Sequence, residues 1–212
     1  MCYHTEQTKL EFEVESRFKA KIKDLHEFKP SSHFNGFDSP KTPIIIDENP
    51  TEILHYNWGL IPFWAQDDSM RLNNLNARIE TLEEKPSFRD IVNKRCLIIA
   101  NGFYDWHWHD SKGKNKSKYE IGIGNHDLFA FAGLYSHWTD ETIGAIKNTY
   151  TIVTTEANEL MAEIHNIKKR MPIILKPEDE KKWLEHYPYQ EFALPYSVNL
   201  VANNLDSQQS LF

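Results

Sequence analysis

The stretch RCLIIANGFYDWHW, residues 95–108, decides the fold class of this 212-residue chain. Its first half is an uninterrupted apolar run, which is typical of a strand buried on both faces. Gly102 marks a turn, and the aromatic-rich half that follows predicts a second strand. A sheet is therefore the expected framework of the molecule.

Further strands are predicted on both sides of this pair. Between Phe34 and Pro62 the chain has short apolar runs punctuated by Pro and Gly, among them PIIID and ILHYNWGLIPFW. Downstream, LFAFAGLY at 128–135 and TYTIVTT at 149–155 read as two more strands. The lysine-rich segment SKGKNKSK at 111–118 reads as a solvated hairpin tip or loop.

Four helices are predicted around this sheet. The first is an amphipathic surface helix over 10–28, ended by Pro30, because Leu10, Val14, Phe18, Ile22 and Leu25 recur at helical spacing. A short polar helix is expected from Arg78 to Lys85. The third runs from Ala157 to Ile164 with Thr155 as its N-cap. The fourth begins near Pro177, with Trp183 and Leu184 facing inward.

No repeat or linker divides the chain. We therefore expect one α+β domain over residues 1–205, built on a curved, mostly antiparallel, barrel-like sheet with peripheral helices. The chain from Asn203 onward is expected to fray, and residues 206–212 to form a flexible tail.

Composition narrows the functional classes. Hydrophobic residues make up 40% and aromatic residues 13% of the chain, enough for a packed core. A net charge of −7 argues against an extended nucleic-acid-coating surface but leaves room for a small basic cleft. Two cysteines, Cys2 and Cys96, cannot build a disulfide framework, which favours a reducing compartment. Without an apolar signal core or a membrane-length run, we expect a cytoplasmic protein of bacterial type that does not enter a membrane.

Cys2 is the residue with the most distinctive chemistry. Removal of Met1, which a small second side chain permits, leaves an α-amine and a thiol on adjacent carbons. The amine can condense with an aldehyde to an imine, and the thiol can then close a five-membered thiazolidine on the same carbon. An α-amine has a pKa of about 7.7–8.0, so a useful neutral fraction exists near pH 7. The alternative is an incidental cysteine near a frayed terminus.

Several other segments carry candidate functional groups. Asn76 and Arg78 in NARIET offer an amide and a forked cation suited to phosphate, although such a segment is more often a loop junction. Asp105, set among aromatic residues, is a candidate acid/base, unless it faces solvent on its strand. His165 precedes the basic run Lys168, Lys169 and Arg170. The alternative is that this run is only a solvent-exposed face.

Aromatic residues in WGLIPFW complete the candidate set. Phe63 and Trp64 could stack on unpaired bases, an interaction worth roughly 1–3 kcal/mol per base. Trp58, in the same segment, is expected in the core.

Taken together, these segments closely resemble the SRAP family, named for SOS-response-associated peptidases and understood as abasic-site processing proteins. The shared motifs run in order along nearly the whole chain: Met-Cys, GF-x-x-P (Gly36, Phe37, Pro40), WGLIPFW, NAR-x-E-T, GFYDW, FAGLY and H…RMP. The resemblance implies the SRAP fold, a cleft for single-stranded DNA containing abasic sites, and a DNA–protein crosslink through Cys2. It also implies a peptidase-type removal of Met1, possible lyase-type chemistry, and association with the nucleoid when DNA is bound.

The resemblance also assigns roles to particular residues. Cys2 is the nucleophile, Asn76 positions the reacting centre, and Arg78 holds a flanking phosphate. Asp105 is the acid/base carboxylate, and His165 transfers protons. The remaining expected DNA contacts are Phe63, Trp64 and Arg170. No metal or cofactor is expected, and the protein is expected to act as a monomer.

Three positions depart from the family pattern. Tyr3 and His4 stand where a Gly-Arg pair is usual, which removes one expected phosphate contact. Asp105 replaces the usual Glu and is one methylene shorter. Four residues separate His165 from Arg170, where many members have the tighter H-x-RMP spacing.

Three other functions fit parts of the sequence. A zinc protein could use Cys2, His4, His107 and His109 as ligands. A non-catalytic module that reads DNA would need no free N-terminus. A cysteine peptidase could use Cys2, Asp105 and His165 as an activated nucleophile set.

Overall fold

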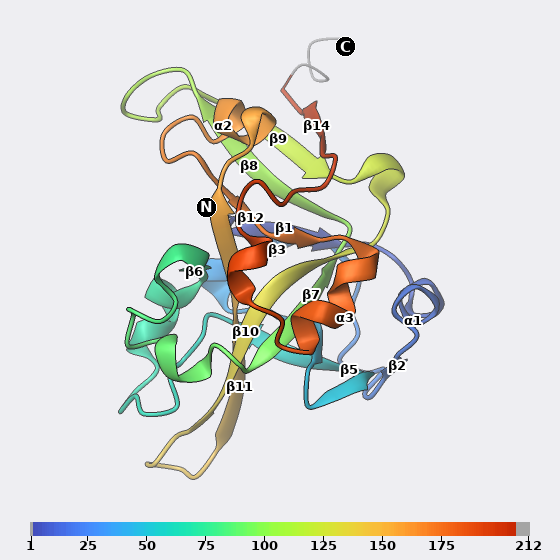
Figure 1. The fold of residues 1–212 in the computed structure, drawn as a ribbon, viewed down its shortest axis with the longest axis vertical. Helices are drawn as coiled ribbons and strands as arrows, with labels where there is room; N and C mark the ends of the chain where they lie inside the picture. The colour runs from blue at the N-terminus through green and yellow to red at the C-terminus, as the bar shows by residue number, and fades with distance from the viewer. Residues whose placement is uncertain (1, 207–212) are drawn as a thin grey trace.

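The computed structural model describes residues 2–206 and consists mainly of two β-sheets with short helices around them (Figure 1). The smaller sheet has five strands in the order β14–β9–β8–β1–β3, and all of its pairings are antiparallel. Its strands are β1 (His4–Gln7), β3 (Ser31–Asn35), β8 (Gly102–Trp108), β9 (Lys116–Gly122) and β14 (Val201–Asn204). The predicted strand pair at 95–108 is present, and its second member, β8, belongs to this sheet.

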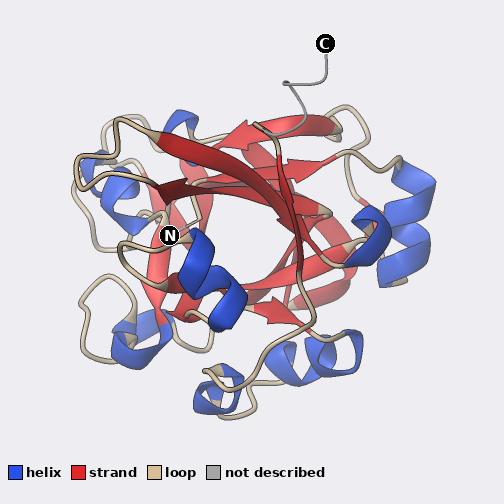
Figure 2. Ribbon diagram, turned by 90° about the horizontal axis from the view of Figure 1, so that it is seen from above, coloured by secondary structure: helices blue, strands red, loops and turns tan. Residues whose placement is uncertain are grey.

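The larger sheet curls until it closes on itself. Its path is β12–β11–β10–β7–β4–β5–β2, and β11 also pairs with β5 in parallel at Thr149 and Asn57. Five strands thereby form a ring, and Figure 2 shows them curving around a common axis. The strands are β2 (Lys21–Ile22), β4 (Lys41–Ile46), β5 (Asn49–Trp58), β6 (Asn76–Arg78), β7 (Arg95–Ala100), β10 (Phe129–Thr139), β11 (Ile146–Glu156), β12 (Arg170–Pro172) and β13 (Ile174–Leu175). The expected α+β class with a barrel-like, mostly antiparallel sheet is confirmed.

Four strands of the ring, β4, β7, β10 and β11, are buried on both faces over most of their length, which explains their continuous apolar runs, while β5 is largely half-buried. Ile44 packs in one core cluster with Phe103 of the smaller sheet. Its neighbour Ile45 points the other way and packs in a second cluster that contains Trp183 of a peripheral helix. Cys2 lies in the first cluster, so the N-terminal segment is part of the core between the two sheets.

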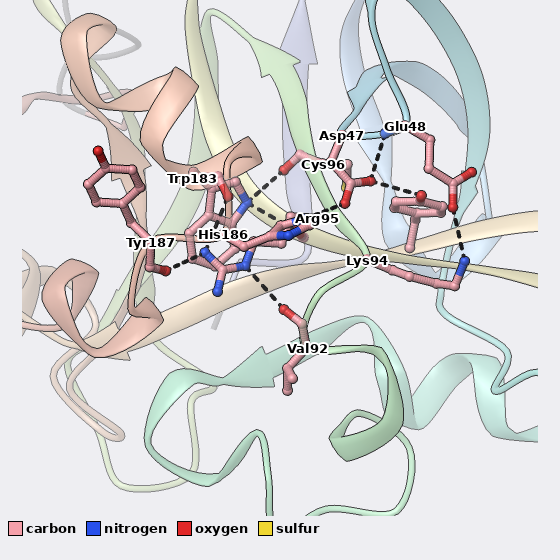
Figure 3. Close-up of polar contacts among 11 residues, drawn as sticks. Asp47, Glu48, Val92, Lys94, Arg95, Cys96, Trp183, His186 and Tyr187 are labelled. Carbon is pink, nitrogen blue, oxygen red and sulfur yellow. Dashed lines mark hydrogen bonds and ion pairs between the residues drawn. The ribbon is translucent and has the colours of Figure 1, made fainter.

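The helix α3 (Glu180–Leu184) is fastened to the ring by a polar network (Figure 3). Trp183 is fully buried, as predicted, while Leu184 is only partly buried. The Arg95 guanidinium lies 4.6 Å from the centroid of the Trp183 ring and donates to the Trp183 carbonyl at 3.2 Å. Beyond the helix, His186 Nε2 lies 2.6 Å from Asp47 Oδ2. The C-terminal part of the chain is therefore held against β4 and β7.

The first predicted helix is much shorter than its apolar spacing suggested. α1 spans Glu11–Phe18 and ends where Lys19 adopts a left-handed conformation with φ of 52°. The next residues form β2, in which Ile22 pairs in parallel with Ile53 of β5. Leu25, expected on the helix face, is 62% exposed. Pairing with a distant strand thus overrides the local helical period, and the predicted helix over 10–28 is wrong beyond Phe18.

Two other local predictions are corrected. α2 (Glu159–Ile164) is capped by Asn158, whose Oδ1 accepts from the Met161 N–H at 2.9 Å. Thr155 remains in β11, and its hydroxyl accepts from the Leu194 N–H. The segment 78–85 contains the end of β6 and a single turn of 3-10 helix instead of a polar α-helix.

Short 3-10 helices make up the remaining helical structure. They are η1 (Gly36–Asp38), η2 (Ser69–Asn74), η3 (Ile79–Thr81), η4 (Arg89–Ile91), η5 (Gly124–His126), η6 (Pro177–Asp179) and η7 (Tyr189–Phe192). Asn203, expected to be frayed, lies in β14 and pairs with Glu120 of β9. Most of the expected tail, residues 207–212, lies outside the described residues, so the boundary at 205 stays a prediction. Within residues 2–206 no helix is long and apolar enough to cross a membrane.

Candidate active site

Cys2 lies two residues before the start of β1 and is completely buried. Its carbonyl accepts a hydrogen bond of 2.9 Å from Asn76 Nδ2, which reaches across from β6 of the other sheet. The Cys2 Sγ lies 3.7 Å from the carbonyl oxygen of His4. Burial raises the pKa of the Cys2 thiol, and the charge of Asp105 raises it further. The thiol is therefore protonated at neutral pH and needs a base in order to react as a nucleophile.

Asn76 is itself held in place by the fold. β6 pairs in parallel with β11, Asn76 opposite Ile152. Trp58, buried as predicted, donates from Nε1 to the carbonyl of Leu75 at 2.9 Å and fixes the preceding residue. The Asn76 Oδ1 atom is buried and accepts no hydrogen bond within residues 2–206. Asn76 thus donates a hydrogen bond to the Cys2 backbone from its amide nitrogen, and its side-chain oxygen remains available as an acceptor.

Asp105 is buried in β8, with 5% of its surface exposed. Its Oδ1 accepts from the Trp106 N–H at 2.8 Å. Burial raises the pKa of Asp105 to about 6, against a usual value near 3.8. A carboxyl group with a pKa close to neutral can both accept and return a proton under physiological conditions. Its effect on the pKa of Cys2 shows that the two groups interact.

His165 is the C-cap residue of α2. Its Nδ1 atom lies 3.1 Å from the backbone nitrogen of Arg170 and 3.0 Å from the Arg170 carbonyl oxygen. Burial lowers the pKa of His165 to about 4, so the imidazole is neutral at pH 7. The ring is anchored through Nδ1, and its orientation is set by the loop that leads into β12. The four residues between His165 and Arg170 therefore form a turn, which is closed by the contacts between the His165 ring and the Arg170 backbone.

Asp105 and His165 line the same cavity, which has a volume of about 340 Å³. The lining residues are Tyr3, His4, Asp105, Trp106, Trp108, Lys116, His165, Ile167 and Lys168. Cys2 is buried next to the lining residue Tyr3 and is not itself part of the wall. The cavity thus brings together an acid/base carboxylate, a neutral imidazole, cationic groups and aromatic rings beside a cysteine.

A second hollow of about 440 Å³ adjoins this cavity and shares Lys168 with it. Arg78, which is exposed at the end of β6, and Lys169 contribute its other free cationic side chains. Neither side chain has a carboxylate within ion-pair distance in the part of the chain that the structure describes. The hollow is therefore a basic depression on an otherwise acidic protein.

Arg170, predicted to contact DNA, lines the second hollow but is buried and occupied. Its guanidinium forms two hydrogen bonds to the Glu80 carboxylate, at 2.9 and 2.8 Å, and donates to the Thr154 carbonyl at 2.9 Å. Arg170 thereby joins β12 to β11 and to the turn after β6. In this arrangement the Arg170 guanidinium binds other residues of the protein, and its contact with DNA stays a prediction.

Replacement of Arg170 separates these two roles. We expect Arg170→Ala to lower the free energy of unfolding by roughly 3 kcal/mol, the lower end for breaking a buried pair, because Glu80 keeps some solvent contact. Denaturant unfolding monitored by Trp fluorescence measures the change. A variant that unfolds like the wild type but binds DNA more weakly would make Arg170 a DNA ligand instead.

Phe63 and Trp64 lie in the loop after β5, 55% and 45% exposed. The loop is pinned where the Trp138 indole donates to the Ala65 carbonyl at 2.6 Å. Neither aromatic residue lines the two hollows. Their exposure is compatible with base stacking, but the structure does not place them beside Cys2, and their DNA contact stays a prediction.

Asn166 is a site residue that the sequence did not single out. Its side chain accepts from the Trp108 N–H at 3.1 Å and donates to the Trp108 carbonyl at 2.8 Å, as a neighbouring strand would. Next to it, the Glu163 carbonyl contacts His107 Nδ1 at 2.7 Å. These contacts tie the loop that carries His165 to the end of β8. The sequence signal that could have identified Asn166 was its position directly after His165.

The four candidate zinc ligands do not converge. His107 contacts the Glu163 carbonyl, and His109 Nε2 contacts Ser117 Oγ at 2.8 Å. His4 Nδ1 instead lies 2.9 Å from His33 Nε2, and the two rings stack. No metal site formed by Cys2, His4, His107 and His109 is found among the described residues.

Comparison with known proteins identifies the family of this chain. The family model for SOS response associated peptidases (SRAP) matches residues 1–206. The abasic site processing protein YoqW of Bacillus subtilis is 47% identical over 160 residues, covering 74% of this chain and 68% of that protein. YoaM of the same species is 44% identical, covering 82% and 76%. The chicken abasic site processing protein HMCES is 29% identical over 66% of this chain and 47% of its own length.

Two solved structures extend the comparison to the fold. A Bacteroides thetaiotaomicron protein superimposes with a TM-score of 0.86 at 33% identity, covering 96% of this chain and 91% of that one. A Bordetella bronchiseptica protein gives a TM-score of 0.80 at 22% identity, a likeness of fold alone. With a family match over residues 1–206 and relatives above 40% identity, the chain belongs to the SRAP family of SOS response associated peptidases.

Proposed function

We propose that this protein processes abasic sites in single-stranded DNA by forming a covalent crosslink through Cys2. The observation that carries the proposal is a cavity lined by Asp105 and His165, with Cys2 buried next to the lining residue Tyr3 and held through its carbonyl by Asn76. Relatives that bear the name abasic site processing protein support the same substrate. We further propose a monomeric, cytoplasmic protein that meets the nucleoid when it binds DNA.

The proposed reaction begins after Met1 has been removed. The free amine of Cys2 attacks the aldehyde carbon of the ring-opened abasic sugar and forms a carbinolamine, which loses water to give an imine. The thiol sulfur then adds to the imine carbon, and the thiol proton passes to the nitrogen. The product is a thiazolidine that links the protein to the sugar through one C–N and one C–S bond, with one water released.

Each neighbouring group has a task in this sequence. Asp105, with a pKa raised to about 6, takes a proton from the Cys2 group and returns it. Neutral His165 acts on the sugar oxygen during ring opening or during reversal of the adduct. Asn76 holds the Cys2 carbonyl and presents Oδ1 to the amine. The same groups, Asp105 and His165, are available for a peptidase-type cleavage of the Met1–Cys2 bond, which would make Cys2 self-activating.

DNA reaches this site along a short path. Arg78, Lys168 and Lys169 bind the phosphates beside the abasic residue in the second hollow. Phe63 and Trp64 stack on unpaired bases farther along the strand. A completely buried cysteine favours a strand that can kink to bring its sugar close, so single-stranded DNA is the proposed form of the substrate.

An adduct assay tests the proposal. We expect protein incubated with a single-stranded oligonucleotide carrying one abasic site to give a shifted band that survives denaturing electrophoresis. An intact duplex with the same lesion should react more slowly, because the paired backbone resists the distortion that brings the sugar to the buried cysteine. An undamaged strand is the control. Absence of a denaturation-resistant species on the abasic strand would refute the proposed function.

His165→Ala distinguishes proton transfer from packing. If His165 transfers protons, the variant should form or reverse the adduct 10²- to 10⁴-fold more slowly, roughly the loss typical of acid/base removal, with DNA affinity retained. If the imidazole only packs, the melting temperature and all activities should fall together. Thermal melting, binding to undamaged DNA and adduct kinetics on the same preparation decide between the two.

A further inference from the structure

The hairpin between β8 and β9 carries four lysines that the proposed reaction does not use: Lys112, Lys114, Lys116 and Lys118. The acidic residue of its turn, Asp110, is engaged with the backbone. Its carboxylate accepts from the N–H groups of Lys112 and Asn115, and these bonds lower the pKa of Asp110. The carboxylate therefore shapes the turn and does not pair with the lysine side chains.

The ammonium groups of this hairpin differ from those of half the other lysines, seven of fourteen. Seven lysines elsewhere lie within 4.0 Å of a carboxylate: Lys21, Lys23, Lys41, Lys94, Lys147, Lys181 and Lys182. Within residues 2–206 none of the four hairpin lysines has such a partner. In a protein with a net charge of −7, the unpaired lysines give this region a local field opposite to that of the whole.

Two of these lysines lie along the face of the sheet beside the cavity. The Nζ atom of Lys116 is 5.2 Å from the centroid of the Trp106 ring, and Lys116 and Trp106 both line the cavity. The Nζ atom of Lys118 is 4.0 Å from the centroid of the Tyr104 ring. Cation–π contacts hold the Lys116 ammonium group at the cavity and the Lys118 ammonium group two residues farther along the same strand.

The hairpin is fixed to the loop that carries His165 and Lys168. Gly113 has a φ of 64°, and a Cβ atom there would lie 2.8 Å from the Trp108 ring, so the turn folds down onto that side chain. Asn166 bonds to both backbone groups of Trp108. The basic hairpin and the basic loop with Lys168 thus line the same cavity and are joined to each other through Asn166 and Trp108.

We propose that the β8–β9 hairpin is a second phosphate-binding arm, in which Lys116 and Lys118 bind the DNA backbone on the side of the abasic residue opposite to Arg78. The inference rests on the proposed function for the place of the lesion, but the binding itself requires no crosslink. The strand then runs from the hollow of Arg78, Lys168 and Lys169 through the cavity to the hairpin.

Salt-dependent binding to an undamaged single strand tests the arm. Each lost phosphate contact reduces the slope of log affinity against log salt by about 0.7. We expect Lys116→Gln/Lys118→Gln to reduce the slope by about 1.4, so a fourfold rise in salt costs the wild type about sevenfold more affinity than the variant. Lys116→Arg/Lys118→Arg should keep the wild-type slope. Lys19→Gln/Lys181→Gln, with the same charge change beside the distant cavity between α1 and α3, is the matched control.

A second measurement places the arm relative to the lesion. DNA strands with the abasic site near the 5′ end or near the 3′ end extend over different sides of the cavity. Extension in either direction should increase the affinity of the wild type, and the hairpin variant should lose this increase in only one direction. An unchanged salt slope, or an equal loss in the matched control, would overturn the proposal. If the wild type forms no adduct at all, the proposed function fails, while the slope on undamaged DNA still decides the role of the hairpin.

Discussion

A chain that keeps or gains a residue ahead of Cys2 should form no stable adduct with abasic DNA. Only a free α-amine can form the imine, and a peptide nitrogen cannot. We therefore expect intact mass spectrometry of active protein to show the loss of one methionine. A version with an uncleavable N-terminal extension should retain its fold and lose crosslinking completely.

Two cysteine variants sharpen this result. Cys2→Ser keeps the amine but provides no thiol, so it should give at most a labile imine that borohydride can trap. Cys96→Ala changes the only other cysteine, which is buried in the same core cluster, and should crosslink normally once folded. A stable adduct from extended, uncleaved protein would eliminate the thiazolidine mechanism.

Asp105→Asn should slow adduct formation by roughly 10²- to 10⁴-fold, because it removes the titrating group and preserves its size. In the wild type the rate should rise with pH through about 6, as the carboxyl group loses its proton and becomes a base. The variant should lose the inflection near pH 6 and keep only the rise that follows deprotonation of the α-amine, whose pKa is about 7.7–8.0. Asp105→Glu, which restores the side chain usual in the family, should keep much of the activity.

Stability provides the control for this variant. The folded pKa of Asp105, about 6, lies above the unfolded value near 3.9, so the native state binds more protons between these values. The contribution of Asp105 to stability is therefore present at low pH and is lost as pH rises through 6. We expect Asp105→Asn to melt at or above the wild-type temperature at pH 8. A variant that crosslinks at the wild-type rate at every pH would remove Asp105 from the mechanism.

The sequence predicted the strands of the core because their apolar runs are long and bounded by turn residues. It also singled out Cys2, Asp105 and His165, whose chemistry is local to each side chain. The structure adds what joins them. The hydrogen bond between Asn76 and the Cys2 carbonyl spans 74 residues, and the ion pair between Arg170 and Glu80 spans 90. Such partners depend on how the sheets close, which periodicity does not encode.

The errors have the same origin. The helical period of Leu10 to Leu25 is real, but the parallel pairing of Ile22 with β5 competes with it and prevails. Thr155 has a hydroxyl suited to capping, yet β11 continues through it until Asn158 takes the position. In both cases the long-range β-pairing of the ring was stronger than a sound local signal.

The closure of the ring by β11 also sets the point during synthesis at which the proposed site is complete. Cys2 is among the first residues made by the ribosome, whereas His165 follows β11, the strand that completes the ring by pairing with β5. A nascent or truncated chain thus carries the amine and thiol without the groups proposed to activate them. Assembly of the site reports that the whole domain has been made and folded. Under the proposed mechanism, acid/base assistance to Cys2 therefore arrives only with the last of its partners.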